Sequence, residues 1–268
     1  MTRSPAARRG SRPDPPPPAP IVPARRLLTV TGASGGLGAS VLSVGVAVRA
    51  AAAGVRVAAV DLDPFGGGLD VTFGAEQTVG LRWSDLSGLD GAADGSALWD
   101  ALPETEGARV LSHSREVVHQ PVAFDRVGPV VAALRAACDL VVVDLPLRGD
   151  GAQEIVAVAD TVVVLAGARL RQVAALTVVA PWLRAAVCTG GDLVVCLRSV
   201  RDDDDVRGVV TTQLGLPVLG VLADDRGLDG DLVHGIPPGT RRGAVTSLAD
   251  LVVARAMLDR RREQEGAA

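Results

Sequence analysis

The stretch LLTVTGASGGLGASVLSVGVAVRAAAAGVRVAAVDLDP, residues 27–64, decides the fold of this chain. We interpret it as a buried strand (27–31), a glycine-rich loop (32–38), a helix (39–53) and a second strand (55–60) that ends at Asp61. Glycines in such a loop let the backbone approach an anion, N–H groups point inward, and the helix dipole favours negative charge. The stretch therefore predicts a phosphate-binding strand–helix–strand unit.

Apolar runs and helical stretches alternate along the rest of the chain, after a glycine- and aspartate-rich stretch (65–94) that predicts loops and short helical turns. Further strands are predicted at 108–112, 139–144, 161–165, 192–197 and 218–222, and helices at 96–102, 124–137, 153–158, 171–187, 203–214 and 247–262. Runs such as DLVVVD (139–144) are typical of strands buried on both faces. We therefore expect an α/β fold, a three-layer, doubly wound and mostly parallel sheet.

The predicted functional site lies at one edge of this sheet. Ligands of doubly wound sheets bind at the carboxyl ends of the strands. The glycine-rich loop, Asp61 and Asp144 all fall at that edge. The three features are therefore expected to lie together.

Length and composition predict one large domain. The chain has 268 residues, 48% of them hydrophobic, which is enough for a full core. Proline- and arginine-rich residues 1–25 predict a disordered arm, residues 26–262 a single α/β domain, and residues 263–268 a tail. No signal peptide or membrane-spanning run is apparent, so the cytoplasm is the expected compartment.

Residue usage excludes several kinds of site. Cys138, Cys188 and Cys196 lie far apart, so we expect small hydrophobic side chains inside helices or strands rather than disulfides or a zinc site. The formal net charge of −4 gives no reason to expect a nucleic-acid partner. All 27 basic residues other than histidine are arginine, and the chain contains no lysine, asparagine or tyrosine.

One interpretation of the loop is a dinucleotide site. TGASGGLG (31–38) fits the T-G-x-x-x-G-x-G fingerprint of short-chain dehydrogenases, and Asp61 could accept a ribose hydroxyl. Those enzymes rely on a Tyr-x-x-x-Lys pair, and this chain has neither residue type. A catalytic dehydrogenase is therefore excluded, while a non-catalytic dinucleotide-binding Rossmann protein stays open.

A second interpretation is a deviant P-loop, K-G-G-x-G-K-[ST], which reads SGGLGAS at residues 34–40 without either lysine. Three further motifs follow: DLDP with GGGLDVTFG (61–74), GLRWSDL (80–86) and LVVVDLP (140–146). In this order they resemble the MinD/ParA superfamily of P-loop NTPases over about residues 27–258. With alanine in the place of the P-loop lysine, the chain looks like the CpaE-like group, actinobacterial septum-site-determining proteins found beside secretion and pilus ATPase genes.

The resemblance implies a role for each residue of the predicted site. The loop would cradle the phosphates of ATP, and the binding residues are Ala33, Ser34, Gly35, Gly36, Leu37, Gly38, Ala39 and Ser40. Ser40, Asp61 and Asp144 would hold Mg²⁺, partly through water. Asp63 would position the attacking water if the protein is an active enzyme. ATP with Mg²⁺, bound weakly, and no cofactor at all both stay open.

The absent lysines decide what such a site could do. Phosphoryl transfer depends on positioning and positive charge, and one charge-assisted hydrogen bond contributes about 1.5–3 kcal/mol. We therefore expect weak or absent ATPase activity, and a nucleotide-gated or pseudo-ATPase scaffold. The alternative is an active ATPase with a substitute arginine, for which Arg148, Arg169 and Arg171 are the candidates.

The resemblance also implies partners. It indicates a regulator of septum placement in cell division, or of pilus and secretion assembly, that acts on protein partners and could form a homodimer. The amphipathic residues 247–262 either pack on the sheet or contact the inner face of the membrane peripherally. Arg82 and Trp83 either pack within the fold or form an exposed turn that anchors a partner.

Overall fold

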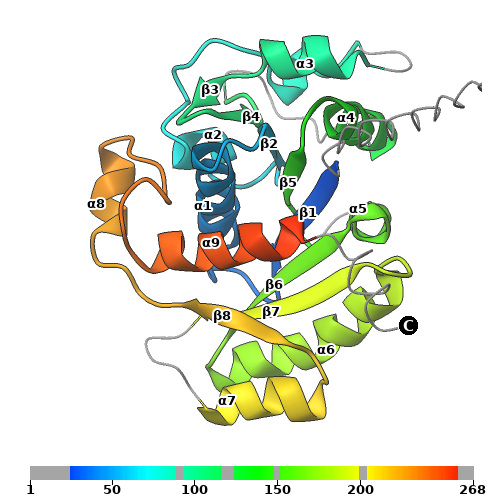
Figure 1. Ribbon diagram of the computed structural model, residues 1–268, viewed down its shortest axis with the longest axis vertical. Helices are drawn as coiled ribbons and strands as arrows, with labels where there is room; N and C mark the ends of the chain where they lie inside the picture. Colours follow the sequence, from blue (N-terminus) through cyan, green and yellow to red (C-terminus); the bar gives the residue numbers. More distant parts are fainter. Residues whose placement is uncertain (1–24, 89–92, 116–123, 148–150, 199–203, 259–268) are drawn as a thin grey trace, which may run out of the picture.

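The computed structural model describes residues 25–88, 93–115, 124–147, 151–198 and 204–258 (Figure 1). The predicted arm and tail therefore lie almost entirely outside the described residues. The described residues form one eight-stranded sheet in the order β3-β4-β2-β5-β1-β6-β7-β8. The strands are β1 (Arg26–Gly32), β2 (Val57–Asp61), β3 (Glu104–Thr105), β4 (Ala108–Leu111), β5 (Leu140–Asp144), β6 (Thr161–Gly167), β7 (Asp192–Arg198) and β8 (Val218–Leu222).

β1 occupies the centre of the sheet, between β5 and β6. Val30 of β1 is in register with Asp144 on one side and with Val163 on the other. Every residue of β5 and β6 is buried, because both faces of the sheet are covered. All described strand pairs are parallel except the short β3–β4 pair. The predicted fold class, a doubly wound and mostly parallel sheet, is thus confirmed.

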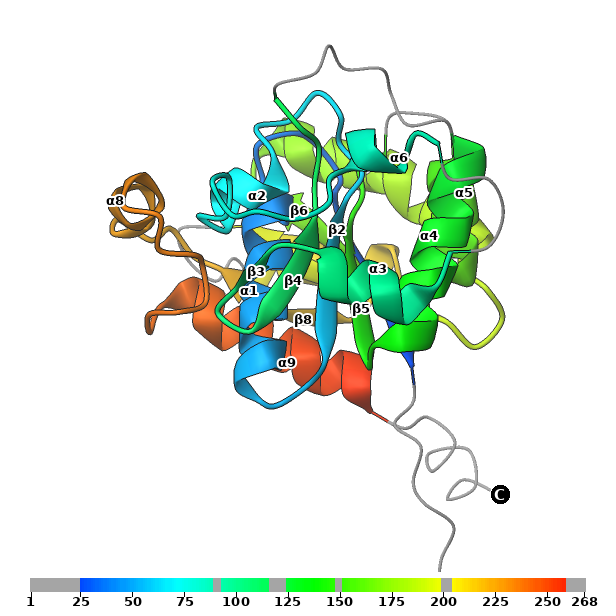
Figure 2. The same ribbon diagram turned by 90° about the horizontal axis from the view of Figure 1, so that it is seen from above.

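Helices cover both faces of the sheet and make the three layers (Figures 1 and 2). One face packs against α1 (Ala39–Ala52), α2 (Leu69–Thr72) and α9 (Ala244–Met257). The other packs against α3 (Gly95–Ala101), α4 (Phe124–Ala137), α5 (Ala152–Val158), α6 (Leu170–Ala186) and α7 (Asp204–Gly208). α8 (Leu228–Val233) has no buried residue and projects from the side of the molecule in both views.

Most predicted elements are present, with bounds shifted by at most three residues; the C-terminal helix ends at Met257 instead of 262, and one predicted helix differs in kind. The helix expected at 203–214 is α7 followed by one turn of π-helix, η2 (Val209–Gln213). The stretch 65–94 contains α2 and a 3₁₀ turn, η1 (Trp83–Leu86), as the prediction of short helical turns anticipated. β3 and α8 were not predicted, because elements of two and six residues carry too little periodicity to identify.

α9 packs tightly on α1. Five of its apolar residues are buried, although Leu251 is 48% exposed, and a Cβ added to Gly45 of α1 would lie 2.6 Å from Val245 Cγ1. The packing alternative for the C-terminal helix is therefore confirmed for its described part, which begins at Ala244 and ends at Met257. No described helix is both long and apolar enough to cross a bilayer. A membrane contact through α9 would need this apolar face to leave the core, and residues 259–262 lie outside the described residues.

Candidate nucleotide site at the carboxyl edge of the sheet

The glycine-rich loop leaves β1 at Gly32 and enters α1 at Gly38. Gly36 and Gly38 have φ angles of 76° and 89°, a region that L side chains rarely adopt. A Cβ at Gly38 would also contact Leu222 of β8 at 3.4 Å. Glycine at these two positions therefore allows the backbone to adopt the conformation of the loop.

The N–H groups of this loop are not used within the fold. Ala33 N donates to Leu165 O (2.9 Å) and Leu42 N donates to Gly38 O (2.9 Å). Between them, the N–H groups of residues 34–41 find no acceptor in the described part of the chain. Ser34 Oγ is also buried without a hydrogen-bond partner among the described residues. Together with the dipole of α1, these donors make a cradle for an anion such as phosphate.

No positive side chain completes the cradle from within the loop, because Ser34 and Ala39 stand where a deviant P-loop has its lysines. Arg198 at the end of β7 is paired with Asp224. Arg169 and Arg171 follow β6 and are exposed, and neither has an ion pair within the described ranges. The predicted candidate Arg148 lies outside the described residues. Among the described residues, the candidates for a substitute cation are therefore Arg169 and Arg171.

Asp144 ends β5 with its side chain buried, at 6% exposure. Ser43 Oγ of α1 lies within hydrogen-bonding distance of its Oδ1 (3.3 Å) and of Ala39 O (3.0 Å). Burial raises the pKa of Asp144 to about 7; hydrogen bonds from Ser40 and Ser43 oppose the rise, and the charges of Asp61 and Asp63 add to it. The carboxyl group thus lies beside the first turn of α1, at the edge of the sheet where it was expected together with the glycine-rich loop.

Asp61 ends β2 and is 2% exposed. Its Oδ1 accepts from Asp63 N (3.0 Å), and its Oδ2 accepts from Leu69 N (2.8 Å) and Ser112 Oγ (2.7 Å). Burial raises its pKa, while these hydrogen bonds and the charge of His113 oppose the rise. Both carboxylate oxygens are already engaged, so Asp61 fits a cation through water rather than by direct ligation.

Asp63 follows β2 on the same edge and is partly exposed. Its Oδ1 accepts from Phe65 N (3.0 Å), which closes a tight turn. Among the described residues no group of three or more His, Cys, Asp or Glu side chains is arranged to hold a metal ion. Magnesium in proteins commonly relies on one or two carboxylates with phosphate oxygens and waters. Ser40, Asp61 and Asp144 therefore fit Mg²⁺ only as part of a bound Mg-nucleotide.

Three residues that the sequence did not indicate complete the surroundings of Asp61. Ser112 Oγ, which follows β4, also lies 3.4 Å from Asp70 Oδ1. Asp70 is 1% exposed and receives two hydrogen bonds from Arg115, at 2.9 and 3.0 Å. Ser112 and Arg115 lie more than 40 positions from Asp70 and belong to no quoted motif, and the GGGLD motif that contains Asp70 gave no sign of this contact.

Arg82 and Trp83 do not form an exposed turn, so the interpretation of a partner anchor is wrong. Trp83 is 2% exposed, and its Nε1 donates to Asp61 O (2.7 Å). Arg82 donates to the carbonyl oxygens of Gly80, Ala75 and Thr78, each at 3.1 Å. The GLRW motif therefore holds the segment after α2 against the end of β2.

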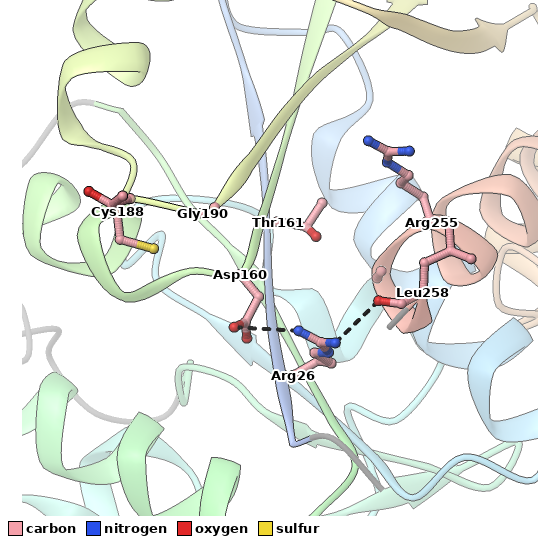
Figure 3. A pocket seen from close by; sticks show the side chains of 10 residues that line it. Arg26, Asp160, Thr161, Cys188, Gly190, Arg255 and Leu258 are labelled. Atoms are coloured by element: carbon pink, nitrogen blue, oxygen red, sulfur yellow. Dashed lines mark hydrogen bonds and ion pairs between the residues drawn. The ribbon is translucent and has the colours of Figure 1, made fainter. Parts of the chain in front are cut away.

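A separate hollow of about 140 Å³ opens at the opposite, amino edge of the sheet (Figure 3). Arg26 there donates to Leu258 O (3.2 Å) and pairs with Asp160 (3.9 Å), and Arg255 pairs with Asp192. Its charges are thus largely matched within the fold. Cys188 lines this hollow and is exposed, which corrects its prediction as a buried side chain, whereas Cys138 and Cys196 are buried as expected.

The chain has a relative in Mycobacterium tuberculosis. The chain is 34% identical over 228 residues to an uncharacterised protein of that organism, present in strains CDC 1551 and H37Rv. The match covers 85% of this chain and 63% of the relative, so the chain spans less than two thirds of the length of that relative. No known protein-family model matches the chain.

Solved structures show the fold. A ParA family ATPase from Chlorobium tepidum has a TM-score of 0.70 at 17% identity, covering 87% of this chain and 99% of that chain. The MinC:MinD cell division protein complex of Aquifex aeolicus gives 0.69 at 18%, covering 87% and 95%. The septum site-determining protein MinD of Pyrococcus horikoshii, complexed with Mg-ADP, gives 0.67 at 17%, covering 86% and 95%. With its cradle of free N–H groups after β1, the chain therefore has the fold of the MinD and ParA P-loop ATPases.

Proposed function

We propose that the chain is a MinD/ParA-type protein that binds a Mg-nucleotide weakly at the carboxyl edge of its sheet. It hydrolyses that nucleotide slowly or not at all, and acts as a nucleotide-gated scaffold. The observation that carries the proposal is the row of N–H groups from residue 34 to residue 41, none with an acceptor in the described part of the chain. They are the donors that phosphate needs, and they stand at the N-terminus of α1.

The missing cations favour binding over catalysis. One charge-assisted hydrogen bond contributes about 1.5–3 kcal/mol, so its loss weakens binding by about 10- to 150-fold. A transition-state arginine alone contributes about 10³–10⁵ in rate. The cradle can therefore still bind a nucleotide, because the loss of the cations lowers the rate of hydrolysis by a larger factor than it lowers the binding affinity. Mg²⁺ bound with the nucleotide would supply positive charge to the phosphates. Ser40 and Asp144 would hold it, Asp61 would act through water, and Asp63 would position the attacking water if hydrolysis occurs.

The proposed partners are proteins. Similarity to a MinC:MinD cell division complex and to a septum site-determining protein supports a role in septum placement. A CpaE-like role in pilus or secretion assembly rests on the sequence motifs alone. In either case the scaffold would present one surface with nucleotide and another without it, either as a monomer or as a homodimer.

The strand order bears on the dinucleotide alternative. In a Rossmann sheet the first two strands of the dinucleotide unit are neighbours. In this protein β5 lies between β1 and β2. The order therefore favours a P-loop nucleotide over NAD(H), and the same titration can compare the two ligands.

The test is calorimetric titration of the full chain with ATP plus Mg²⁺ and, separately, with NADH. We expect micromolar to millimolar binding of Mg-ATP that is lost in Gly38→Val and weakened in Asp144→Ala. Gly54→Ala is the control, because Gly54 also has a positive φ (81°) but lies at the other end of α1, and a Cβ there would meet nothing within 4 Å. Tight NADH binding, or no binding of Mg-ATP even at millimolar concentration, would overturn the proposal.

A gain-of-function variant tests the missing charge. Ala39→Lys restores a lysine at the start of α1, and we expect Mg-ATP affinity to rise by about 10- to 150-fold. Ala39→Met supplies a long side chain without charge and should leave the affinity unchanged. If both variants behave alike, the loop is not a phosphate site.

A further inference from the structure

Asp61 and Asp70 are two buried carboxylates that meet at one hydroxyl group. Ser112 Oγ lies 2.7 Å from Asp61 Oδ2 and 3.4 Å from Asp70 Oδ1, and Ser112 is fully buried. Leu69 N donates both to Ser112 Oγ (3.1 Å) and to Asp61 Oδ2 (2.8 Å). A serine hydroxyl has a single proton to donate. The two carboxylates therefore compete for it, and the distances show that Asp61 receives it.

Arg115 removes the competition from Asp70. Its two terminal nitrogens donate to the two oxygens of Asp70, at 2.9 and 3.0 Å, while Arg82 Nε stands further away, at 3.6 Å. A buried carboxylate without such a partner would seek the nearest remaining donor. Asp70 Oδ1 already accepts from Val71 N (2.9 Å), and after that contact the Ser112 hydroxyl, at 3.4 Å, is nearer than Arg82 Nε.

The glycine at position 68 fits this arrangement. A Cβ on Gly68 would lie 2.6 Å from Arg115 Nη1 and 2.6 Å from Asp70 Oδ1. Gly68 also has a φ of 91°. The adjacent Gly67 has open space around its Cα and no positive φ. The last glycine of the GGGLD motif therefore makes room for the Arg115–Asp70 pair.

We propose that Ser112 and Arg115 are positioning residues of the candidate nucleotide site: Arg115 satisfies Asp70, which leaves the Ser112 proton to Asp61. Asp61 in turn fixes the N–H groups of Asp63 and Leu69, and so sets the turn that carries Asp63. The inference rests on the proposed function for its consequence in nucleotide binding. Its structural part, the sharing of one proton, holds without any nucleotide.

The first experiment measures amide hydrogen exchange in the full chain without nucleotide. Ser112→Ala and Arg115→Ala should each speed exchange at Leu69 and Asp63 by about 2- to 10-fold, the effect of one net hydrogen bond. Ser112→Thr keeps the hydroxyl and should restore slow exchange. Arg49→Ala is the matched control, because it breaks an arginine–aspartate pair (Arg49–Asp250, 2.7 Å) that lies between α1 and α9.

The decisive variant removes the competing charge. In Asp70→Asn the neutral amide no longer draws the Ser112 proton, so adding Arg115→Ala should leave exchange at Leu69 nearly unchanged. If Arg115 only braced the turn, the double variant would exchange at least as fast as Arg115→Ala. Gly68→Ala should resemble Arg115→Ala, and Gly67→Ala should resemble the unmodified chain.

Mg-ATP titration of the same variants completes the test. Affinity should fall in Ser112→Ala and Arg115→Ala and recover in Ser112→Thr and in the double variant. If the unmodified chain binds no Mg-ATP, the proposed function fails while the exchange data still decide the proton sharing. If exchange at Leu69 is the same in Arg115→Ala and Arg49→Ala, the inference is wrong whatever the nucleotide result.

Discussion

Asp61 and Asp144 stand in register on the adjacent parallel strands β2 and β5, and both carboxyl groups are buried. Side chains in register on neighbouring parallel strands point to the same face of the sheet. Two buried acids therefore meet beside the first turn of α1, and the charge of Asp61 contributes to the raised pKa of Asp144. This pair of buried acids supports the proposal that a cation binds here together with a nucleotide.

The pH dependence of stability should reveal Asp144. Its folded pKa of about 7 lies above the ordinary 3.8, so between about pH 4 and 7 the folded state holds a proton that the unfolded state releases. Stability from this group therefore falls as pH rises through that window. Asp144→Asn should gain stability relative to the unmodified chain as pH rises, by at most about 4 kcal/mol for this difference in pKa. Urea denaturation at pH 4.5, 6 and 8 measures the trend.

The control for this experiment is Asp125→Asn, at an exposed acid of α4. If the difference in stability between Asp144→Asn and the unmodified chain does not change with pH, the pKa of Asp144 is not raised.

Gly45→Ala should destabilise the fold by about 1–3 kcal/mol, the usual cost of overpacking. The added methyl group would lie 2.6 Å from Val245 Cγ1. Val245→Ala in the same chain should recover part of the loss, because it removes that atom. Gly128→Ala in α4 is the matched control: a Cβ there meets nothing within 4 Å, so helix propensity alone should act. Equal stability of the Gly45 and Gly128 variants in chemical denaturation would contradict the close packing of α1 and α9.

A thiol reagent should modify one of the three cysteines of the native protein. Cys188 is exposed, whereas burial raises the pKa values of Cys138 and Cys196 to about 12. The thiolate is the reactive species, so the two buried cysteines should react only after denaturation. Mass spectrometry should find one label in native protein, three in urea, and none in native Cys188→Ser. A second label in the native protein would show that one of the two core cysteines is accessible.

Arg82→Ala should loosen the segment after α2. The guanidinium donates to three carbonyl groups, of Ala75, Thr78 and Gly80, and their loss removes the closure of that turn. Cleavage after the exposed Glu76 by a glutamate-specific protease should become faster by about 10-fold or more, since each net hydrogen bond contributes about 0.5–1.5 kcal/mol. Arg82→Lys should not restore resistance, because an ammonium lacks the planar fork. Unchanged cleavage in Arg82→Ala would mean that other contacts hold the turn.

Much of the fold could be predicted from local pattern. Strands such as β5 and β6 are continuous apolar runs because both faces are covered, and such runs are visible in any short window. The loop, Asp61 and Asp144 were predicted at one edge because parallel strands bring their carboxyl ends together. The roles assigned to these residues in binding Mg-nucleotide stay predictions.

The surroundings of Asp61 could not be predicted in the same way. Ser112 reaches Asp61 across 51 positions in sequence and Arg115 reaches Asp70 across 45, through contacts that no periodicity encodes. Trp83 could be interpreted from the sequence as an exposed anchor, because its neighbours are polar. In the structure its indole ring is buried, and Nε1 donates to Asp61 O. Polar contacts between distant segments are set by the tertiary fold, and the sequence shows only that suitable side chains exist.

The central place of β1 has a consequence for synthesis of the chain. Thr31 and Ala33 are held by Leu145 O and Leu165 O, more than 100 residues later. While the ribosome is making the first half of the protein, β1 has no neighbour on either side, and an unpaired strand edge is a template for wrong pairing. The loop that is translated first is therefore among the last parts to assemble. A chain that stops before Leu165 would carry the complete loop sequence without the strand that orders it.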